Sequence, residues 1–234
     1  MKLNYEPLEK IRVKMPGNRV SLIVAHCHDK IVLDLGCYDE TALSKRNTKQ
    51  WLHQEIASVA RFVLGIDNSP KIPSEGIRVN EKSKIIRGDA LNLDHAQLGL
   101  YDFDLIVAGE LIEHLPNTID FFVKLKSVFH GKQLICSTPN ATSLSNVLLG
   151  VLNRESAHHD HLQVYSYKTL NTLCLRAGFA EWEIIPYHVY FTEMILMSSG
   201  VKRIGIQGIE QLINVCEKLF PLLSGGLILN VARI

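Results

Sequence analysis

The chain has 234 residues, of which 47% are hydrophobic and 21% charged, a balance typical of one large folded domain rather than a disordered chain. Its formal net charge of +1 gives the molecule no strong overall electrostatic field that would attract nucleic acid, a membrane surface or an acidic partner. A local basic patch would not show in this total. The five cysteines are scattered and form no C-x-x-C pair, which excludes a disulfide framework and a thiolate metal site.

The N-terminal residues contain no apolar core of the kind that a signal peptide needs. Farther along, no apolar run approaches the roughly 20 residues that span a bilayer. We therefore expect the protein to lie in the reducing cytoplasm and to have no membrane span.

Short apolar runs alternate with helix-like segments along the chain, which is typical of βαβ units and a parallel sheet. The runs are nearly continuous rather than alternating, as expected for strands that are covered on both faces. They are Ile31–Leu35, Phe62–Ile66, Ile85–Ile86, Leu105–Ala108 and Leu134–Cys136, with later strands at Trp182–Ile185 and Leu227–Val231. Apolar spacing predicts helices at Lys49–Ala60 and Ile119–Phe129, and a further helix at Leu170–Ala177 that Gly178 would end. The predicted fold class is α/β with a Rossmann-like doubly wound sheet.

Two segments, 141–168 and 186–226, do not fit this alternation. We predict that both are insertions beside the substrate cleft of a single domain spanning residues 1–234. The second segment carries apolar residues on one helical face, for which core packing is favoured over a membrane or dimer surface. These residues are Ile209, Leu212, Ile213, Cys216 and Leu219.

The informative residues follow the apolar runs directly, and in doubly wound sheets ligands bind outside the carboxyl ends of the strands. After the first run, beyond Asp34, Gly36 lets the backbone approach a ligand closely, and a small neighbour such as Cys37 leaves room for it. At the tip of the second run, Asp67 can accept hydrogen bonds from both hydroxyls of a ribose, with a helix-capping role as the alternative.

The third and fourth runs end in a similar way. Asp89, followed by Ala90, could take the exocyclic amine of an adenine. Glu110 follows the fourth run, next to the expected amino-acid end of a nucleoside cofactor. A nicotinamide dinucleotide is not expected, because a complete G-x-G-x-x-G is needed to seat a pyrophosphate and this chain lacks the second glycine.

Taken together, four motifs in order resemble those of class I S-adenosylmethionine-dependent methyltransferases. They are Ile31–Cys37, Gly65–Asp67, Gly88–Ala90 and Glu110–Leu115. The resemblance implies a seven-stranded sheet of order 3-2-1-4-5-7-6 whose last strand is antiparallel, with S-adenosylmethionine as cofactor. It places the methionine end of the cofactor at Asp34, Gly36 and Cys37. It places the ribose at Asp67 and the adenine at Asp89 and Ala90, and it includes Glu110 among the residues that bind the cofactor.

The chain departs from that family where glycines usually follow Gly36. Tyr38 and Glu40 stand in their place, so either the loop is crowded and the affinity reduced, or the loop follows a different path. The distance along the chain from Gly36 to Asp67 is also long, which predicts an extra turn around Ser44–Gln50.

A second group of residues can move protons. Glu113 and His114 follow Glu110 at helical spacing and would share a helix face with it. His161 lies in a later histidine-rich segment, and imidazole is the natural proton acceptor near neutral pH. We predict that His114 or His161 accepts the proton and that Glu113 orients it. The alternatives are charge complementation at a helix N-terminus for Glu113 and a packing role for His114, while His158 and His159 are expected in a solvated loop.

A metal ion is the alternative to such a base. One set of residues also resembles the metal-binding set of small-RNA 2′-O-methyltransferases. That set would be Glu110, Glu113, His114 and His161. However, the same Glu-x-x-Glu-His-Leu occurs in metal-free relatives, and the stretch from Asp160 to Phe179 looks most like enzymes encoded with surface-glycan synthesis. We therefore expect no metal.

These features favour methyl transfer to an oxygen, with nitrogen as the second choice, of a small-molecule or glycan-type acceptor. Nucleic acid is not the expected acceptor, because the chain lacks the basic and aromatic stripes that stack single-stranded bases. Two alternatives stay open: a degenerate fold that acts as a non-catalytic binding module, and a metal-dependent RNA ribose 2′-O-methyltransferase. The oligomeric state is not predicted.

Overall fold

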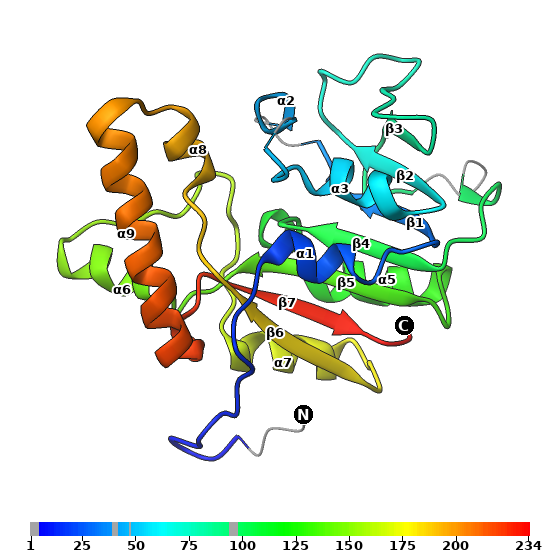
Figure 1. Ribbon diagram of the computed structural model, residues 1–234. Helices are drawn as coiled ribbons and strands as arrows, with labels where there is room; N and C mark the ends of the chain where they lie inside the picture. The colour runs from blue at the N-terminus through cyan, green and yellow to red at the C-terminus, as the bar shows by residue number, and fades with distance from the viewer. Residues whose placement is uncertain (1–4, 39–41, 47, 94–97) are drawn as a thin grey trace.

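A seven-stranded sheet runs through the centre of the protein in the computed structural model, which describes residues 5–38, 42–46, 48–93 and 98–234 (Figure 1). Each predicted strand is present, and several are longer than the apolar run that predicted them. The strands are β1 Ile31–Leu35, β2 Phe62–Asp67, β3 Ser83–Arg87, β4 Leu105–Gly109, β5 Gln133–Pro139, β6 Trp182–Tyr187 and β7 Gly226–Val231.

The order of the strands is β3-β2-β1-β4-β5-β7-β6. β7 runs antiparallel to both of its neighbours, while the pairs among β1 to β5 are parallel. The predicted sheet order and the antiparallel last strand are therefore confirmed. Because the parallel strands share one direction, the residues that follow β1, β2 and β4 meet at one edge of the sheet.

Helices cover both faces of this sheet. α1 (Arg19–Val24) and α3 (Leu52–Val59) pack on the face that includes Val32, whereas α5 (Thr118–Val128) and α7 (Tyr167–Arg176) pack on the face that includes Leu33 and Leu35. Each strand thus buries apolar side chains in both directions. This two-sided burial explains why the runs read as continuous in the sequence.

Local signals set the ends of these helices. Asn18 and Asn117 cap α1 and α5 by accepting hydrogen bonds from backbone N–H groups of the first turn. Gly178 follows α7 with a φ of +70°, the left-handed conformation predicted for it. The expected extra turn after β1 contains the short helix α2 (Ala42–Lys45), whereas Glu40 lies outside the described residues.

The two segments outside the alternation hold additional helices. Segment 141–168 contains α6 (Leu144–Val151), and segment 186–226 contains α8 (Thr192–Leu196), α9 (Gly200–Leu219) and a short 3-10 turn at Pro221–Leu223. Figure 1 shows α6, α8 and α9 gathered to one side of the sheet. The description of the chain as one domain with two insertions stays a prediction.

The expected core packing of the apolar face of α9 is wrong for most of its residues. Ile213 is buried and Cys216 half-buried, but Ile209, Leu212 and Leu219 are exposed. A 3.6-residue periodicity identifies an apolar helix face but does not show what covers that face. In the structure, α9 is oriented so that only part of its apolar face packs against the rest of the protein. No helix in the described part of the chain has both the length and the apolar character to pass through a bilayer.

Candidate active site

The loop after β1 turns sharply at the sheet edge. Gly36 has a φ of +70°, and its N–H donates to the carbonyl of Ile66 at 2.9 Å. A Cβ at this position would lie 3.0 Å from Leu111 Cδ1, so a side chain would be both strained and crowded. Glycine is therefore required here by the backbone, and the loop stays close to the end of β2.

Tyr38, which stands where the family usually has a glycine, is directed into the protein. Its ring is buried and packs edge-on against Trp51, with the ring centroids 6.1 Å apart. The indole Nε1–H of Trp51 donates to the carbonyl of Cys37 at 2.9 Å, which ties the loop to the start of α3. The tyrosine thus belongs to a small apolar cluster beneath the loop.

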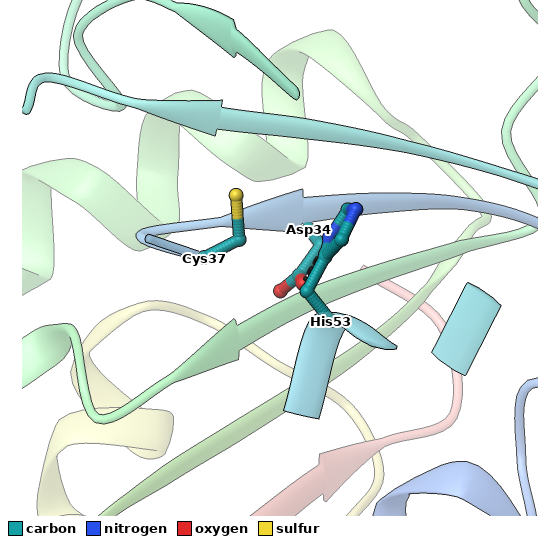
Figure 2. A group of neighbouring side chains, drawn as sticks. All are labelled: Asp34, Cys37 and His53. Carbon is teal, nitrogen blue, oxygen red and sulfur yellow. Dashed lines mark hydrogen bonds and ion pairs between the residues drawn. The ribbon is translucent and has the colours of Figure 1, made fainter. Parts of the chain in front are cut away.

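Asp34 is paired rather than open. Its carboxylate lies 2.9 Å from Nδ1 of His53, a residue of α3, and both side chains are buried (Figure 2). Asp34, Cys37 and His53 offer ligand atoms within 4.8 Å of one another, and His53 Nε2 has no hydrogen-bond partner among the described residues. No sequence pattern singled out His53. A direct contact of Asp34 with a cofactor stays a prediction.

Asp67 receives two backbone N–H groups at the end of β2. Its Oδ2 accepts from Tyr38 at 2.9 Å and its Oδ1 accepts from Ser69 at 2.8 Å. These two hydrogen bonds from the backbone orient the carboxylate at the end of the strand. This geometry fits the ribose contact predicted for Asp67.

A pocket of about 250 Å³ opens beside Asp89 at the end of β3. The exposed carboxylate of Asp89 accepts hydrogen bonds from the Leu91 N–H and from Asn92 Nδ2, both at 2.8 Å. Aliphatic and polar side chains both line this pocket. The lining consists of Ile66, Ile86, Arg87, Gly88, Asp89, Asn92, Leu93 and Leu98.

Glu110 follows β4 in a left-handed conformation, with a φ of +53°, which is uncommon for a residue other than glycine. Its Oε1 accepts hydrogen bonds from the Ser137 and Tyr187 hydroxyls, each at 2.8 Å, and lies 3.8 Å from the Arg19 guanidinium. Burial, and then the charge of Glu110, raise the pKa of Tyr187 well above its usual value, so its hydroxyl remains a donor.

These three partners were missed by the sequence analysis. Ser137 lies at the end of the fifth strand, and the rule that polar residues follow strands would have found it there. Arg19 and Tyr187 come from segments far from Glu110 in the chain, and no local pattern connects them with it.

Glu113 is buried, with Thr138 close to its carboxylate. Neither of its carboxylate oxygens has a hydrogen-bond partner among the described residues. Burial, and then the charge of Glu110, raise the pKa of Glu113 to about 9. The segment forms only one turn of 3-10 helix, Ile112–His114, so the prediction of a shared α-helical face with Glu110 is wrong. The turn lies between β4 and α5.

His114 and His161 come together as expected. Their rings meet edge to face, with centroids 4.7 Å apart, and Nδ1 of His114 lies 3.2 Å from the carbonyl oxygen of Asp160. Burial, and then the charges of His114 and His158, lower the pKa of His161, so its ring is neutral near neutral pH. His158 and His159 are exposed beside Asp160, in agreement with the prediction for them.

Backbone contacts position the segment that carries His161. The Leu162 and Gln163 N–H groups donate to the Glu113 carbonyl at 2.9 and 3.1 Å. The segment then enters α7 through a capping box, in which Ser166 and Thr169 bond each other's backbone.

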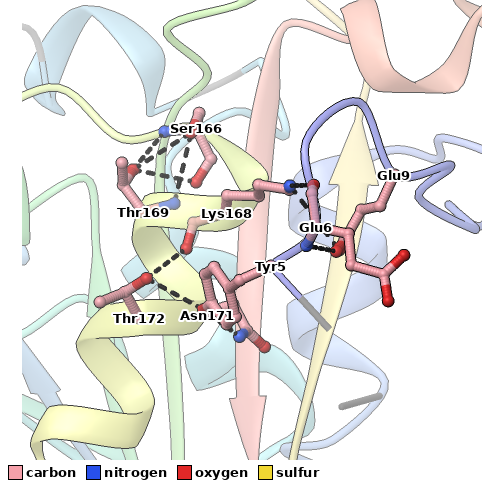
Figure 3. Close-up of polar contacts among 8 residues, drawn as sticks. All are labelled: Tyr5, Glu6, Glu9, Ser166, Lys168, Thr169, Asn171 and Thr172. Atoms are coloured by element: carbon pink, nitrogen blue, oxygen red, sulfur yellow. Dashed lines mark hydrogen bonds and ion pairs between the residues drawn. The ribbon is translucent and has the colours of Figure 1, made fainter. Parts of the chain in front are cut away.

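The N-terminal part of the chain also contacts this helix (Figure 3). The Tyr5 hydroxyl contacts Thr172 and Asn171, and Lys168 pairs with Glu9. These contacts brace α7, and with it the segment that carries His161.

Glu113, His114 and His161 offer ligand atoms that all lie within 4.8 Å of one another. One carboxylate and two imidazoles form a donor set that suits a divalent transition metal. The two unpartnered oxygens of Glu113 fit such an ion, since a bound cation would satisfy them. Glu110 is not part of this group, because its carboxylate is directed to Ser137 and Tyr187.

Residues 15–184 match the model of a family described as a methyltransferase domain, over more than two thirds of the chain. The chain therefore belongs to the methyltransferase domain family and is an enzyme. This membership confirms the family resemblance and removes the alternative of a non-catalytic binding module. No curated protein matches the chain in sequence.

Solved structures share the fold at low sequence identity. The small RNA methyltransferase HEN1 is 19% identical with a TM-score of 0.57, over 96% of this chain and 27% of that one. A SAM-dependent methyltransferase from Thermotoga maritima is 12% identical with a TM-score of 0.56, over 92% and 87%. The methyltransferase domain of a bacterial Hen1 is 15% identical with a TM-score of 0.52, over 91% and 96%. This chain thus spans about a quarter of HEN1, and these likenesses show the fold alone.

Proposed function

We propose that this enzyme transfers the methyl group of S-adenosylmethionine to an oxygen, with nitrogen as the second choice, of a small-molecule or glycan-type acceptor. The observation that carries the proposal is the pair of facing imidazoles, His114 and His161, at the same sheet edge as the four cofactor motifs. The lowered pKa of His161 leaves this ring able to take a proton near neutral pH.

The cofactor would lie along the carboxyl ends of the strands. The pocket beside Asp89 suits the adenine because it combines aliphatic side chains with polar groups such as Asp89 and Asn92. Asp67 would hold the ribose. The amino-acid portion would lie at the tight turn of Gly36 and Cys37, near Glu110. Support for this order comes from the four motifs, which follow β1, β2, β3 and β4 in turn.

Methyl transfer mainly requires the enzyme to hold the acceptor atom close to the methyl group and in line with the bond that breaks. The sulfonium is already a good leaving group, so the acceptor oxygen attacks the methyl carbon in line and the C–S bond breaks. The acceptor proton would pass to a neutral imidazole. Asp160 is the hydrogen-bonding partner of His114 in the structure. The orienting role predicted for Glu113 therefore remains a proposal without a hydrogen bond behind it.

One observation favours a second candidate function, metal-dependent methylation of an RNA ribose hydroxyl. The buried and unpartnered carboxylate of Glu113 lies beside His114 and His161, in a donor set that fits a divalent cation. Such an ion would lower the pKa of an acceptor hydroxyl and align it. HEN1, one of the proteins that share the fold, is named a small RNA methyltransferase.

A methyl-transfer assay with labelled S-adenosylmethionine distinguishes the two candidate functions. Phenols, sugars and RNA oligonucleotides would be offered as acceptors, each with and without chelator. Labelling of a phenol or sugar that persists in chelator is the expected result. Labelling of RNA alone, lost with chelator and restored by manganese, would establish the second function. Calorimetry that shows no binding of S-adenosylhomocysteine would contradict both.

A further inference from the structure

The outward face of α9 carries exposed apolar side chains near both of its ends. The exposed fractions are 87% for Val201, 70% for Ile204, 66% for Leu212, 55% for Val215 and 70% for Leu219. Eight positions separate Ile204 from Leu212, but at 100° per residue all five side chains fall on one side of the helix. We call this set of five residues the α9 stripe.

Nothing in the described part of the chain covers the α9 stripe. Gly205 and Gly208 lie within it, and a Cβ built at either glycine has no neighbouring atom within 4 Å. The opposite side of the helix is fixed to the protein through Ile206 and Ile213, which are buried. The outward direction of the stripe therefore follows from the fold.

Buried polar contacts hold α9 in this rotation. The carboxylate of Glu217 lies 2.7 Å from Nδ1 of His188, just after β6, and both residues are buried. Glu210 accepts a hydrogen bond from the backbone N–H of Phe191. Both acidic side chains of α9 are thus turned toward the protein.

The exposed charges of α9 are positive. Lys202, Arg203 and Lys218 are exposed, and their side chains have no hydrogen bond or ion pair within the described residues. Glu193, the acidic residue of α8, is paired with Lys45 at 3.2 Å. At 100° per residue, Lys202 and Lys218 lie on the two margins of the α9 stripe.

Neighbouring helices of the same lobe also present apolar side chains to solvent. α6 and α8 lie on the same side of the sheet as α9 (Figure 1). α6 with the residue after it exposes four apolar side chains, and α8 with the residue after it exposes three. They are Val147, Leu148, Val151, Leu152, Met194, Leu196 and Met197. An exposed apolar area on three adjacent helices exceeds what isolated surface residues account for, and marks a site of contact.

We propose that α9 lies flat on an anionic lipid surface, with the α9 stripe at the boundary of headgroups and acyl chains. An interfacial helix combines an apolar face with lysines at its margins, whose stems cross apolar surface to reach the phosphates. Anionic lipid then complements the unpaired cations. α9 lies along the surface rather than through it, since no described helix can cross a bilayer.

A second copy of the chain is a poorer occupant of this face. In a face-to-face pair of α9 helices, each copy would bring Lys202, Arg203 and Lys218 to the rim of the contact and no exposed acidic side chain of α9, because Glu210 and Glu217 are turned inward. A second copy therefore offers no charge of opposite sign to these cations.

Cosedimentation of the full chain with vesicles tests the proposal. Vesicles of phosphatidylcholine would be compared with vesicles that also contain phosphatidylglycerol. We expect binding to the mixed vesicles and its weakening by added salt. The double substitution Leu212→Gln and Val215→Gln should reduce partitioning by about tenfold or more, since apolar burial drives interfacial binding. Both residues are exposed, and thermal melting would verify that the variant is folded.

Matched variants separate this surface from general effects. Val123→Gln with Leu175→Gln replaces two exposed apolar helix residues elsewhere and should leave binding unchanged. Lys202→Glu with Lys218→Glu should abolish the preference for phosphatidylglycerol. The control variant, Lys71→Glu with Lys82→Glu, changes the net charge by the same amount at exposed positions elsewhere. It should retain most of the preference for phosphatidylglycerol.

Three outcomes would overturn the proposal. One is an unmutated chain that stays in the supernatant with both vesicle types. Another is a control variant that loses as much binding as its partner variant. The third is a dimer in sedimentation equilibrium that Leu212→Gln with Val215→Gln converts to monomer, because the face would then belong to a second copy. None of these measurements depends on the cofactor or the acceptor.

Discussion

The hydroxyl of Tyr187 donates a hydrogen bond to the Glu110 carboxylate at 2.8 Å, and so joins the end of β6 to the end of β4. Two further strands, β5 and β7, lie between them in the sheet. The bond spans the carboxyl edge and orients the carboxylate of Glu110, whose backbone is left-handed. Tyr187 thus positions Glu110 at the edge where we propose that the cofactor binds.

Tyr187→Phe removes that bond while keeping the ring. A hydrogen bond to a charged group contributes about 1.5–3 kcal/mol, so the variant should lose stability of that order in urea unfolding. S-adenosylhomocysteine should also bind more weakly, because Glu110 is less constrained. Tyr190→Phe, which breaks a bond to Asn18 instead, is the control for affinity. Unchanged stability and affinity would show that the Tyr187 bond is incidental.

Asp67→Ala should weaken the binding of S-adenosylhomocysteine by at least about tenfold, because one charged hydrogen bond lost is worth roughly that factor. Calorimetry measures the change. Asp102→Ala removes an aspartate whose partner is Lys132 on the surface, and should leave affinity intact. An Asp67→Ala variant that is folded and binds with parental affinity would refute the ribose role.

Tyr38 should matter for packing rather than for ligand contact. Tyr38→Phe keeps the ring against Trp51 and is expected to retain both stability and cofactor affinity. Tyr38→Gly leaves a cavity in the buried cluster, which for large aromatic truncations costs about 3–5 kcal/mol. Thermal melting and calorimetry of the two variants test this. A Tyr38→Phe variant with tenfold lower affinity would instead assign the hydroxyl to the cofactor.

Stability should depend on pH through Glu113. In the folded chain the carboxyl group of Glu113 has a pKa of about 9 and stays protonated at lower pH. In an unfolded chain it loses its proton near the ordinary carboxyl pKa. The folded state therefore binds more protons in that window, and its stability falls as pH rises. Glu113→Gln cannot ionise, so its stability relative to the parent should rise from about pH 5 to about pH 8.

This prediction is checked by thermal melts in the presence of chelator. The matched control is Glu81→Gln, an exposed glutamate whose substitution should show no such trend. A difference between Glu113→Gln and the parent that stays flat with pH would mean that the carboxylate is charged in the folded protein.

His161→Ala should lower turnover while leaving the affinity for S-adenosylhomocysteine nearly unchanged. The lowered pKa of His161 predicts that activity persists below the ordinary imidazole range and then falls as the ring gains a proton. Initial rates against pH for the parent and for His161→Ala test this. His159→Ala, an exposed neighbour, is the control. Equal pH profiles for parent and His161→Ala would exclude it as the base.

The strands were predictable from sequence because a sheet covered on both faces requires continuous apolar runs, as in Ile31–Leu35. Their order came from a resemblance, since no local pattern contains strand order. The exposure of Leu212 could not be predicted, because a buried helix face and an uncovered one have the same periodicity. His53 and Tyr187 were missed for another reason. Their partners, Asp34 and Glu110, lie on other elements, and folding alone brings them together.

The position of β7 has a consequence for synthesis of the protein. β7 fills the gap between β5 and β6, although it follows them in the chain by the whole of α8 and α9. While the nascent chain leaves the ribosome, β5 and β6 each present an open strand edge, and such edges pair readily with other chains. A nascent chain stalled before Gly226 should therefore bind chaperones or aggregate, and release of the last strand should end that exposure.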